Sequence, residues 1–113
     1  MTSDLIIQKL FDDLETAIVF VSKGEVNKSR VVARQVAGKA IRSLLPKINI
    51  KISPSVNPYQ CLLIAKENIE TFSPVIEDLN ALTLKVNPDY TFPEELDLIK
   101  SAKNILEFVK DYK

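Results

Sequence analysis

Apolar residues recur at three- and four-residue steps over long stretches of this chain, and this spacing restricts it to a helical fold. The first stretch runs from Ser3 to Lys23, and its apolar positions share one helix face: Ile7, Leu10, Phe11, Leu14, Ala17, Ile18 and Val21. Gly24 follows, and glycine readily adopts the left-handed conformation that ends a helix. With Asn27 as the predicted N-cap of the next helix, the two helices form a hairpin.

A second helix is predicted from Asn27 to Leu45, with Pro46 ending it. Its apolar residues form one row and a supporting row, namely Val32, Val36, Ala40 and Leu44 with Ala33, Ala37 and Ile41. Gly38 lies in mid-helix, where glycine costs about 1 kcal/mol relative to alanine. Either another segment approaches this face closely or the chain tolerates the cost.

The segment from Lys47 to Asn57 alternates polar residues with isoleucines at Ile48, Ile50 and Ile52. Because no other strand pattern lies nearby, we expect an extended connector whose isoleucines pack on the bundle. Asn57-Pro58 then predicts a cap and the first position of a third helix. Its inward residues are expected to be Leu62, Leu63, Ala65, Ile69 and Phe72.

Ser73-Pro74 either starts a fourth, shorter helix or kinks a longer one, with inward residues Val75, Ile76, Leu79 and Leu82. Asn87-Pro88-Asp89 is a predicted turn. The last helix is predicted from Thr91 to Tyr112, with Pro93, Glu94 and Glu95 in its first turn and Leu98, Ile99, Ala102, Ile105, Leu106 and Val109 lining it. We therefore expect an all-α fold: a single domain over residues 1–113 that forms an antiparallel up-and-down bundle of four to five helices.

Composition excludes several classes of protein. The chain has 113 residues and no histidine, which removes the commonest general acid and base and the usual zinc ligand. Its single cysteine, Cys61, excludes an intrachain disulfide, fits a reducing compartment and is expected to be a buried structural thiol. The N-terminus lacks a signal-peptide layout, and no apolar run approaches the ~20 residues of a membrane span. We expect a soluble cytoplasmic protein with no membrane partner.

Known catalytic motifs are also missing from the sequence. Gly24 and Gly38 lie too far apart to build a glycine-rich phosphate loop. Adjacent carboxylates such as Asp12-Asp13 diverge by ~100° on a helix, so we expect them to be solvated rather than to share a ligand. We expect no enzyme activity, no cofactor and no bound metal.

Charge is unevenly distributed although it balances over the whole chain. Residues 23–51 carry eight basic residues and one acid, net +7, while the flanking segments carry −3 and −4. On the predicted second helix Lys39 and Arg42 face away from the core, and Arg30 and Arg34 border its apolar stripe. Such asymmetry favours an anionic partner at one surface. Alternatively, these residues form surface ion pairs within the bundle, each contributing at most ~1 kcal/mol.

The order and spacing of many residues resemble HEPN domains, which are small helical modules. Residues 11–45 resemble the first helical hairpin of that family, and residues 73–113 agree with its second half in outline. The matching residues are Asp13, Leu14, Glu15, Ala17, Gly24, Asn27, Ala33, Gln35, Ala37, Lys39, Ala40, Ile41, Leu44 and Leu45, then Leu79, Asn80, Pro88, Asp89, Phe108 and Val109.

Departures from the HEPN pattern bear on function. Catalytic members are metal-independent ribonucleases that use an arginine followed four to six residues later by a histidine, and this chain has no histidine. Val32 and Lys28 stand where the family often has histidine and tryptophan, and Gly38 replaces the usual glutamate before the lysine. The resemblance therefore implies a non-catalytic member.

Two functional hypotheses follow. The first is a non-catalytic HEPN-like module, expected as a homodimer, that binds RNA or nucleotide phosphates through the basic face of its second helix, with candidate residues Arg30, Arg34, Lys39 and Arg42. The family implies a minimal nucleotidyltransferase as the partner, in a defence or toxin-antitoxin pair. The second hypothesis is a helical scaffold subunit whose basic face docks an acidic protein surface, including another copy of the same chain.

Overall fold

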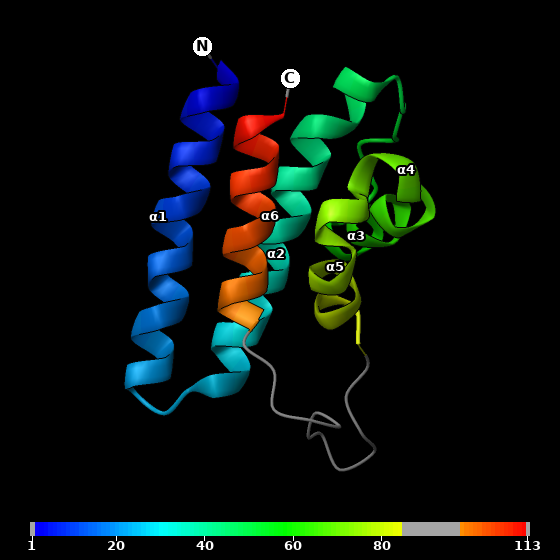
Figure 1. Cartoon of the computed structure of the whole chain (residues 1–113). Helices are drawn as coiled ribbons and strands as arrows, with labels where there is room; N and C mark the ends of the chain where they lie inside the picture. The colour runs from blue at the N-terminus through cyan, green and yellow to red at the C-terminus, as the bar shows by residue number, and fades with distance from the viewer. Residues whose placement is uncertain (1, 85–97, 113) are drawn as a thin grey trace.

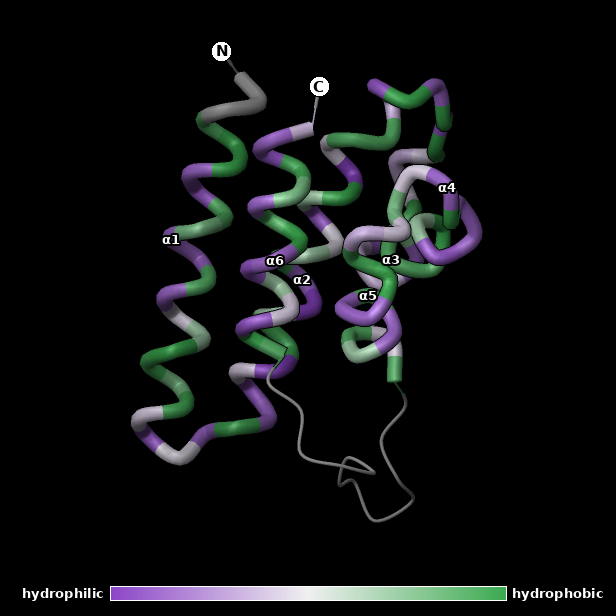
Figure 2. Tube along the Cα trace, in the orientation of Figure 1, coloured by the Kyte–Doolittle hydropathy of each residue, from purple (hydrophilic) through white to green (hydrophobic). Residues whose placement is uncertain are grey.

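The computed structural model describes residues 2–84 and 98–112, and all regular structure in this part is helical. Helices α1 (Thr2–Ser22) and α2 (Val26–Leu44) form the predicted hairpin, and α6 (Leu98–Asp111) packs against both (Figure 1). The apolar face of each of these helices points inward, so that green and purple alternate along the trace in Figure 2. The prediction of an all-α bundle is confirmed.

Short helices cover the other side of α2 and α6. They are α3 (Pro58–Glu67), α4 (Ile69–Phe72) and α5 (Ile76–Leu82). The 3-10 turn η1 (Leu45–Ile48) directly follows α2, and the 3-10 turn η2 (Ser73–Val75) joins α4 to α5. Helix α3 packs on α2, and α5 packs on α6 and α3. The largest fully buried side chains come from both sides of the bundle: Phe72, Ile41, Leu44, Leu45, Leu62, Leu79, Leu82, Ile105 and Leu106.

The turn between α1 and α2 is closed by Gly24. Gly24 adopts a positive φ of 78°, and its amide donates to the carbonyl of Val21 at 3.0 Å, while the amide of Glu25 donates to the carbonyl of Phe20 at 2.8 Å. This pair of bonds is a Schellman motif, so Gly24 ends the helix as predicted. The predicted cap at Asn27 is wrong, because the tight turn lets α2 begin at Val26 with Glu25 as its N-cap.

The segment after α2 differs in part from the prediction. Helix α2 ends at Leu44, and Pro46 lies inside the turn η1 rather than beyond the last helical residue. The predicted connector therefore loses Lys47 and Ile48 to η1, and its remaining residues, 49–57, form neither helix nor strand. The expected packing of isoleucines on the core is confirmed for Ile48, Ile50 and Ile52.

The third predicted helix begins as expected but is interrupted. Asn57 caps α3 through a reciprocal capping box with Gln60, and Pro58 takes the first turn. Asn68 then breaks the helix, because its side-chain amide donates to the carbonyl of Ile64 at 2.8 Å in competition with the backbone ladder. Beyond the break the chain forms α4 and η2, so Ser73-Pro74 precedes α5 by one 3-10 turn.

Four predicted core residues are exposed. Leu63 and Ile69 are 38% and 57% exposed, since Leu63 lies about 100° away from buried Leu62 on α3 and Ile69 follows the helix break. Ile18 and Val21 are 48% and 45% exposed at the hairpin end of α1, which extends past the described start of α6 (Figure 1). The last helix agrees with its prediction from Leu98 onward, whereas its predicted beginning at Thr91 and the turn at Asn87-Pro88-Asp89 lie outside the described residues.

Candidate functional site

The four candidate phosphate-binding residues lie on α2 but in three different environments. Arg30 and Arg34 follow each other by one turn on the side that faces α5, Arg42 lies under the connector, and Lys39 is exposed beside α1. Eight residues separate Arg34 from Arg42, about 12 Å along the helix axis. The structure therefore does not gather the four cations at one point.

Arg34 holds the C-terminal end of α5. Its Nε donates to the carbonyl of Leu82 at 2.9 Å, and its Nη2 donates to the carbonyl of Leu84 at 2.7 Å. The hydroxyl of Tyr59 donates to the carbonyl between them, that of Thr83, at 3.3 Å. A cation satisfies the last carbonyls of a helix and interacts favourably with its dipole, so this position has a structural role.

The charge of Arg34 is retained in this half-buried position. Burial lowers the pKa of Arg34, the nearby Tyr59 raises it, and Arg30 lowers it. The ordinary pKa of arginine lies so far above neutral pH that the guanidinium stays protonated despite this burial.

Arg42 holds the connector against α2. Its Nη1 donates to the carbonyl of Val56, and its Nη2 donates to the carbonyl of Pro54 at 3.1 Å and more weakly to that of Ser53 at 3.5 Å. Because these acceptors are uncharged carbonyl groups, they satisfy the N–H donors without neutralising the positive charge.

Cys61 lies close to Arg42 in the interior. Its side chain is fully buried, as predicted for a structural thiol. Burial raises the pKa of the Cys61 thiol, and the guanidinium of Arg42 opposes this effect without outweighing it. A thiol that stays protonated near neutral pH is a poor nucleophile.

Lys39 and Arg42 line a hollow of about 330 Å³ between α1 and α2. The hollow is completed by Ser43 of α2 and by residues of α1, namely Ile6, Lys9, Leu10 and Asp13. Three cations and one carboxylate therefore surround a space whose other walls are largely apolar. The sequence predicted two of these cations but missed Lys9.

A second hollow of about 320 Å³ lies nearer the turn, between the same two helices. It is lined by Phe20 of α1 and by Asn27, Lys28, Val31 and Val32 of α2. Lys28 lies 5.7 Å from the centroid of the Phe20 ring and also pairs with Glu25 at 3.1 Å. Val31 is 52% exposed, which leaves an apolar surface on this face of the hairpin.

The two hollows lie on the same face of the α1–α2 hairpin. On each helix their lining residues, apart from Asn27, fall on one stripe, because the seven residues from Asp13 to Phe20 and from Val32 to Lys39 make nearly two full turns. We call this surface the α1–α2 groove; its stripes are Ile6, Lys9, Leu10, Asp13 and Phe20 on α1, and Lys28, Val31, Val32, Lys39, Arg42 and Ser43 on α2. The predicted antiparallel hairpin could have indicated this site, because antiparallel pairing about the turn brings Lys9 of α1 beside Lys39 of α2.

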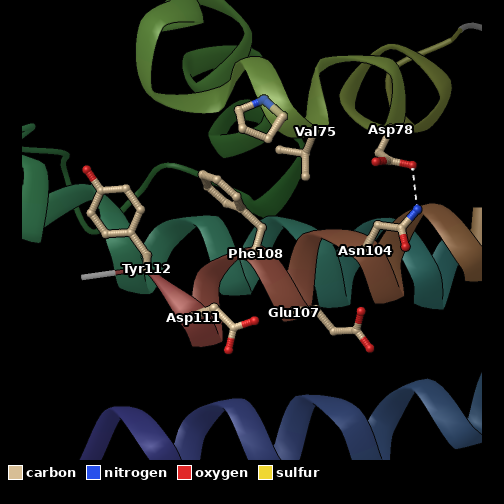
Figure 3. A pocket seen from close by; sticks show the side chains of 8 residues that line it. Val75, Asp78, Asn104, Glu107, Phe108, Asp111 and Tyr112 are labelled. Atoms are coloured by element: carbon tan, nitrogen blue, oxygen red, sulfur yellow. Dashed lines mark hydrogen bonds between the residues drawn. The ribbon is translucent and has the colours of Figure 1, made fainter.

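An acidic hollow of about 670 Å³ lies on a different face, between η2, α5 and α6 (Figure 3). In Figure 3 Phe108 extends from α6 toward the side of η2, with the ring of Tyr112 beside it, whereas Glu107 and Asp111 point to the opposite side. Asp78 accepts a hydrogen bond from Asn104 at 3.1 Å. Within the described part of the chain, no three His, Cys, Asp or Glu side chains come together closely enough to hold a metal ion.

Comparisons with known proteins give no relative from which to assign a family. A scan against family models, a search of curated proteins and a search of solved structures each found no match. Among the helices of residues 2–84 and 98–112, none is long and apolar enough to cross a bilayer.

Proposed function

We propose that the protein is a non-catalytic helical interaction module whose α1–α2 groove docks an acidic surface of a partner protein. The observation that carries this proposal is the mixed lining of the groove. Lys9, Lys39 and Arg42 surround the same hollow as Ile6 and Leu10. Apolar surface favours a partner that has side chains to bury, and the surrounding cations select one with negative charge.

The arrangement of the arginines also favours a protein partner. Bidentate binding of phosphate uses two parallel N–H groups of one guanidinium. In Arg34 and Arg42, N–H groups on two nitrogens of the guanidinium already donate to backbone carbonyls. The hydrogen bonds of these two residues thus hold α5 and the connector, and Arg42 in addition places its positive charge beside the groove.

A second candidate function is the binding of RNA or nucleotide phosphates by a HEPN-like module. Its support is the net charge of +7 over residues 23–51, together with the uncharged carbonyl acceptors around Arg42. Under this proposal the partner protein is a minimal nucleotidyltransferase. Co-purification of the chain with such an enzyme encoded beside it tests that context.

The two candidates are separated by binding to two labelled polyanions, poly-L-glutamate and a single-stranded RNA, across a salt series. We expect the full chain to bind poly-L-glutamate at low salt and to lose affinity as salt rises. The double variant Lys9→Glu with Lys39→Glu should weaken binding by roughly tenfold or more, because it reverses two charges of the groove.

Lys47→Glu with Lys51→Glu is the matched control, since these exposed lysines make the same change of charge outside the groove. Tighter binding of RNA than of poly-L-glutamate, lost equally in both double variants, supports the phosphate candidate instead. Failure to bind either polymer at low salt contradicts both candidates.

The homodimer expected from the sequence stays a prediction. Sedimentation velocity across the same salt series tests it, because an assembly held by opposite charges dissociates as salt rises and an apolar one does not. A monomer at all protein and salt concentrations would contradict the dimer without affecting the docking of another protein.

A further inference from the structure

We infer that the α1–α2 groove is a docking site for an acidic amphipathic helix that carries two apolar anchors about eleven residues apart. This inference rests on the proposed function and adds the form of the partner. Three properties of the groove carry it: its two hollows, their spacing and the sign of the charge around them.

The spacing of the hollows follows from the helix that forms their wall. Leu10 lines one hollow and Phe20 lines the other, and ten residues of helix span about 15 Å. A helix laid along the groove brings residues i and i+11 to the same face about 16 Å apart, so one apolar side chain can enter each hollow. Residues i and i+9 fall on opposite faces and cannot do so.

Each hollow offers an apolar wall to such an anchor. Ile6 and Leu10 line the first hollow, and Phe20, Val31 and Val32 line the second. Ile6 and Val31 are 46% and 52% exposed, so apolar surface on both helices is available for burial by a partner.

Charge complementarity selects an acidic partner. Among the residues that the structure describes, the groove is lined by the cations Lys9, Lys28, Lys39 and Arg42 and by one carboxylate, that of Asp13. Lys28 forms an ion pair with Glu25. The largest excess of positive charge therefore lies around the first hollow, which Lys9, Lys39 and Arg42 line. Glutamates that flank the anchors of the docked helix meet these cations at the edge of the groove, where they raise the association rate and set orientation.

The test uses three labelled peptides of about eighteen residues and the full chain. The first peptide has two leucines eleven residues apart among glutamate, alanine and glutamine; the second has the same composition with the leucines nine apart; the third has lysine in place of glutamate. Fluorescence anisotropy should show that the first binds roughly tenfold or more tightly than the second, because only the first presents both leucines to the groove. The lysine peptide should not bind.

Variants of the chain locate the contact. Val31→Ser should weaken the first peptide by roughly tenfold through lost apolar contact. Ile69→Ser is its matched control, since Ile69 is 57% exposed on α4 and lies outside the groove. Circular dichroism of both variants verifies that they fold.

Three other results would each overturn the inference. Equal binding of the two acidic peptides, together with retained binding of poly-L-glutamate, overturns the helix with two anchors and leaves the proposed function standing. Loss of peptide binding in Ile69→Ser as large as in Val31→Ser also overturns it. Self-association of the chain that Val31→Ser abolishes makes a second copy the occupant and overturns the acidic helix.

Discussion

Gly38 of α2 lies directly against the backbone of Pro58, the first residue of α3. A Cβ atom built on Gly38 would lie 2.2 Å from the carbonyl oxygen of Pro58 and 2.6 Å from its Cα atom. Both distances are shorter than any van der Waals contact, so a side chain at this position would force the two helices apart. The glycine in mid-helix therefore marks a close helix approach, which was one of the two alternatives left open by the sequence.

Replacing Gly38 by alanine should destabilise the protein although alanine favours helix. The helix propensity gained is about 1 kcal/mol. Overpacking against a backbone that is fixed by the capping box of α3 should cost more, with a net loss of about 2 kcal/mol in the free energy of unfolding. Urea denaturation of Gly38→Ala measures this loss. Gln35→Ala, at an exposed position of the same helix, is the control and should change stability by less than about 0.5 kcal/mol. A more stable Gly38→Ala variant would show that α3 moves freely on α2.

Arg34 connects α2 to the end of α5, and its loss should loosen α5 selectively. Arg34→Met removes two charge-assisted hydrogen bonds to the carbonyls of Leu82 and Leu84. We expect the free energy of unfolding to fall by about 2 kcal/mol. Hydrogen exchange should report faster opening of the amides of α5 than of those at the centre of α1. Lys39→Met removes an exposed cation from the same helix and should leave exchange in α5 unchanged; equal acceleration in both variants would contradict the role of Arg34 as a cap.

The contrast between Gly24 and Arg34 shows how far the sequence alone can lead. Gly24 and the capping residue Asn57 were predictable because their partners lie within five residues along the chain. Arg34 donates to carbonyls 48 and 50 residues away, and helix phase gives no information on which distant backbone it meets. The charge of the second helix was therefore predictable, but its division between structural cations and the cations of the groove was not.

The same reasoning explains the errors in element boundaries. Asn27 is a good capping residue, yet the Schellman motif at Gly24 closes the turn before Asn27 is reached. Asn68 was predicted to lie in a continuous helix because its neighbours keep a helical apolar pattern. Its side-chain bond to Ile64, four residues earlier, is one of several local alternatives that this pattern does not distinguish. Lys9 was not predicted as a site residue, because its place beside Lys39 follows from the pairing of α1 with α2 and not from the charge of either segment.

Asn57 and Gln60 should act as a unit in stabilising the start of α3. The amide of Gln60 donates to the side chain of Asn57 at 2.8 Å, and the amide of Asn57 donates to the side chain of Gln60 at 2.9 Å. Asn57→Ala should lower the free energy of unfolding by about 1 kcal/mol. In a double-mutant cycle the loss from Asn57→Ala with Gln60→Ala should differ from the sum of the two single losses. Strict additivity would show that the two bonds form independently.

Cys61 should make the free energy of unfolding depend on pH at values above the ordinary thiol pKa. Burial raises its pKa in the folded chain, so the folded state keeps the proton at pH values where the unfolded chain has lost it. The free energy of unfolding should then be unaffected at lower pH and should decrease as pH rises past the ordinary thiol pKa. Cys61→Ala removes this titration. The difference in stability between Cys61→Ala and the unchanged chain should therefore shift in favour of the variant between about pH 7 and about pH 10. Because lysines and tyrosines titrate in both proteins, only this difference reports on Cys61. Parallel pH profiles would show that the thiolate is tolerated inside the fold, with Arg42 close enough to compensate its burial.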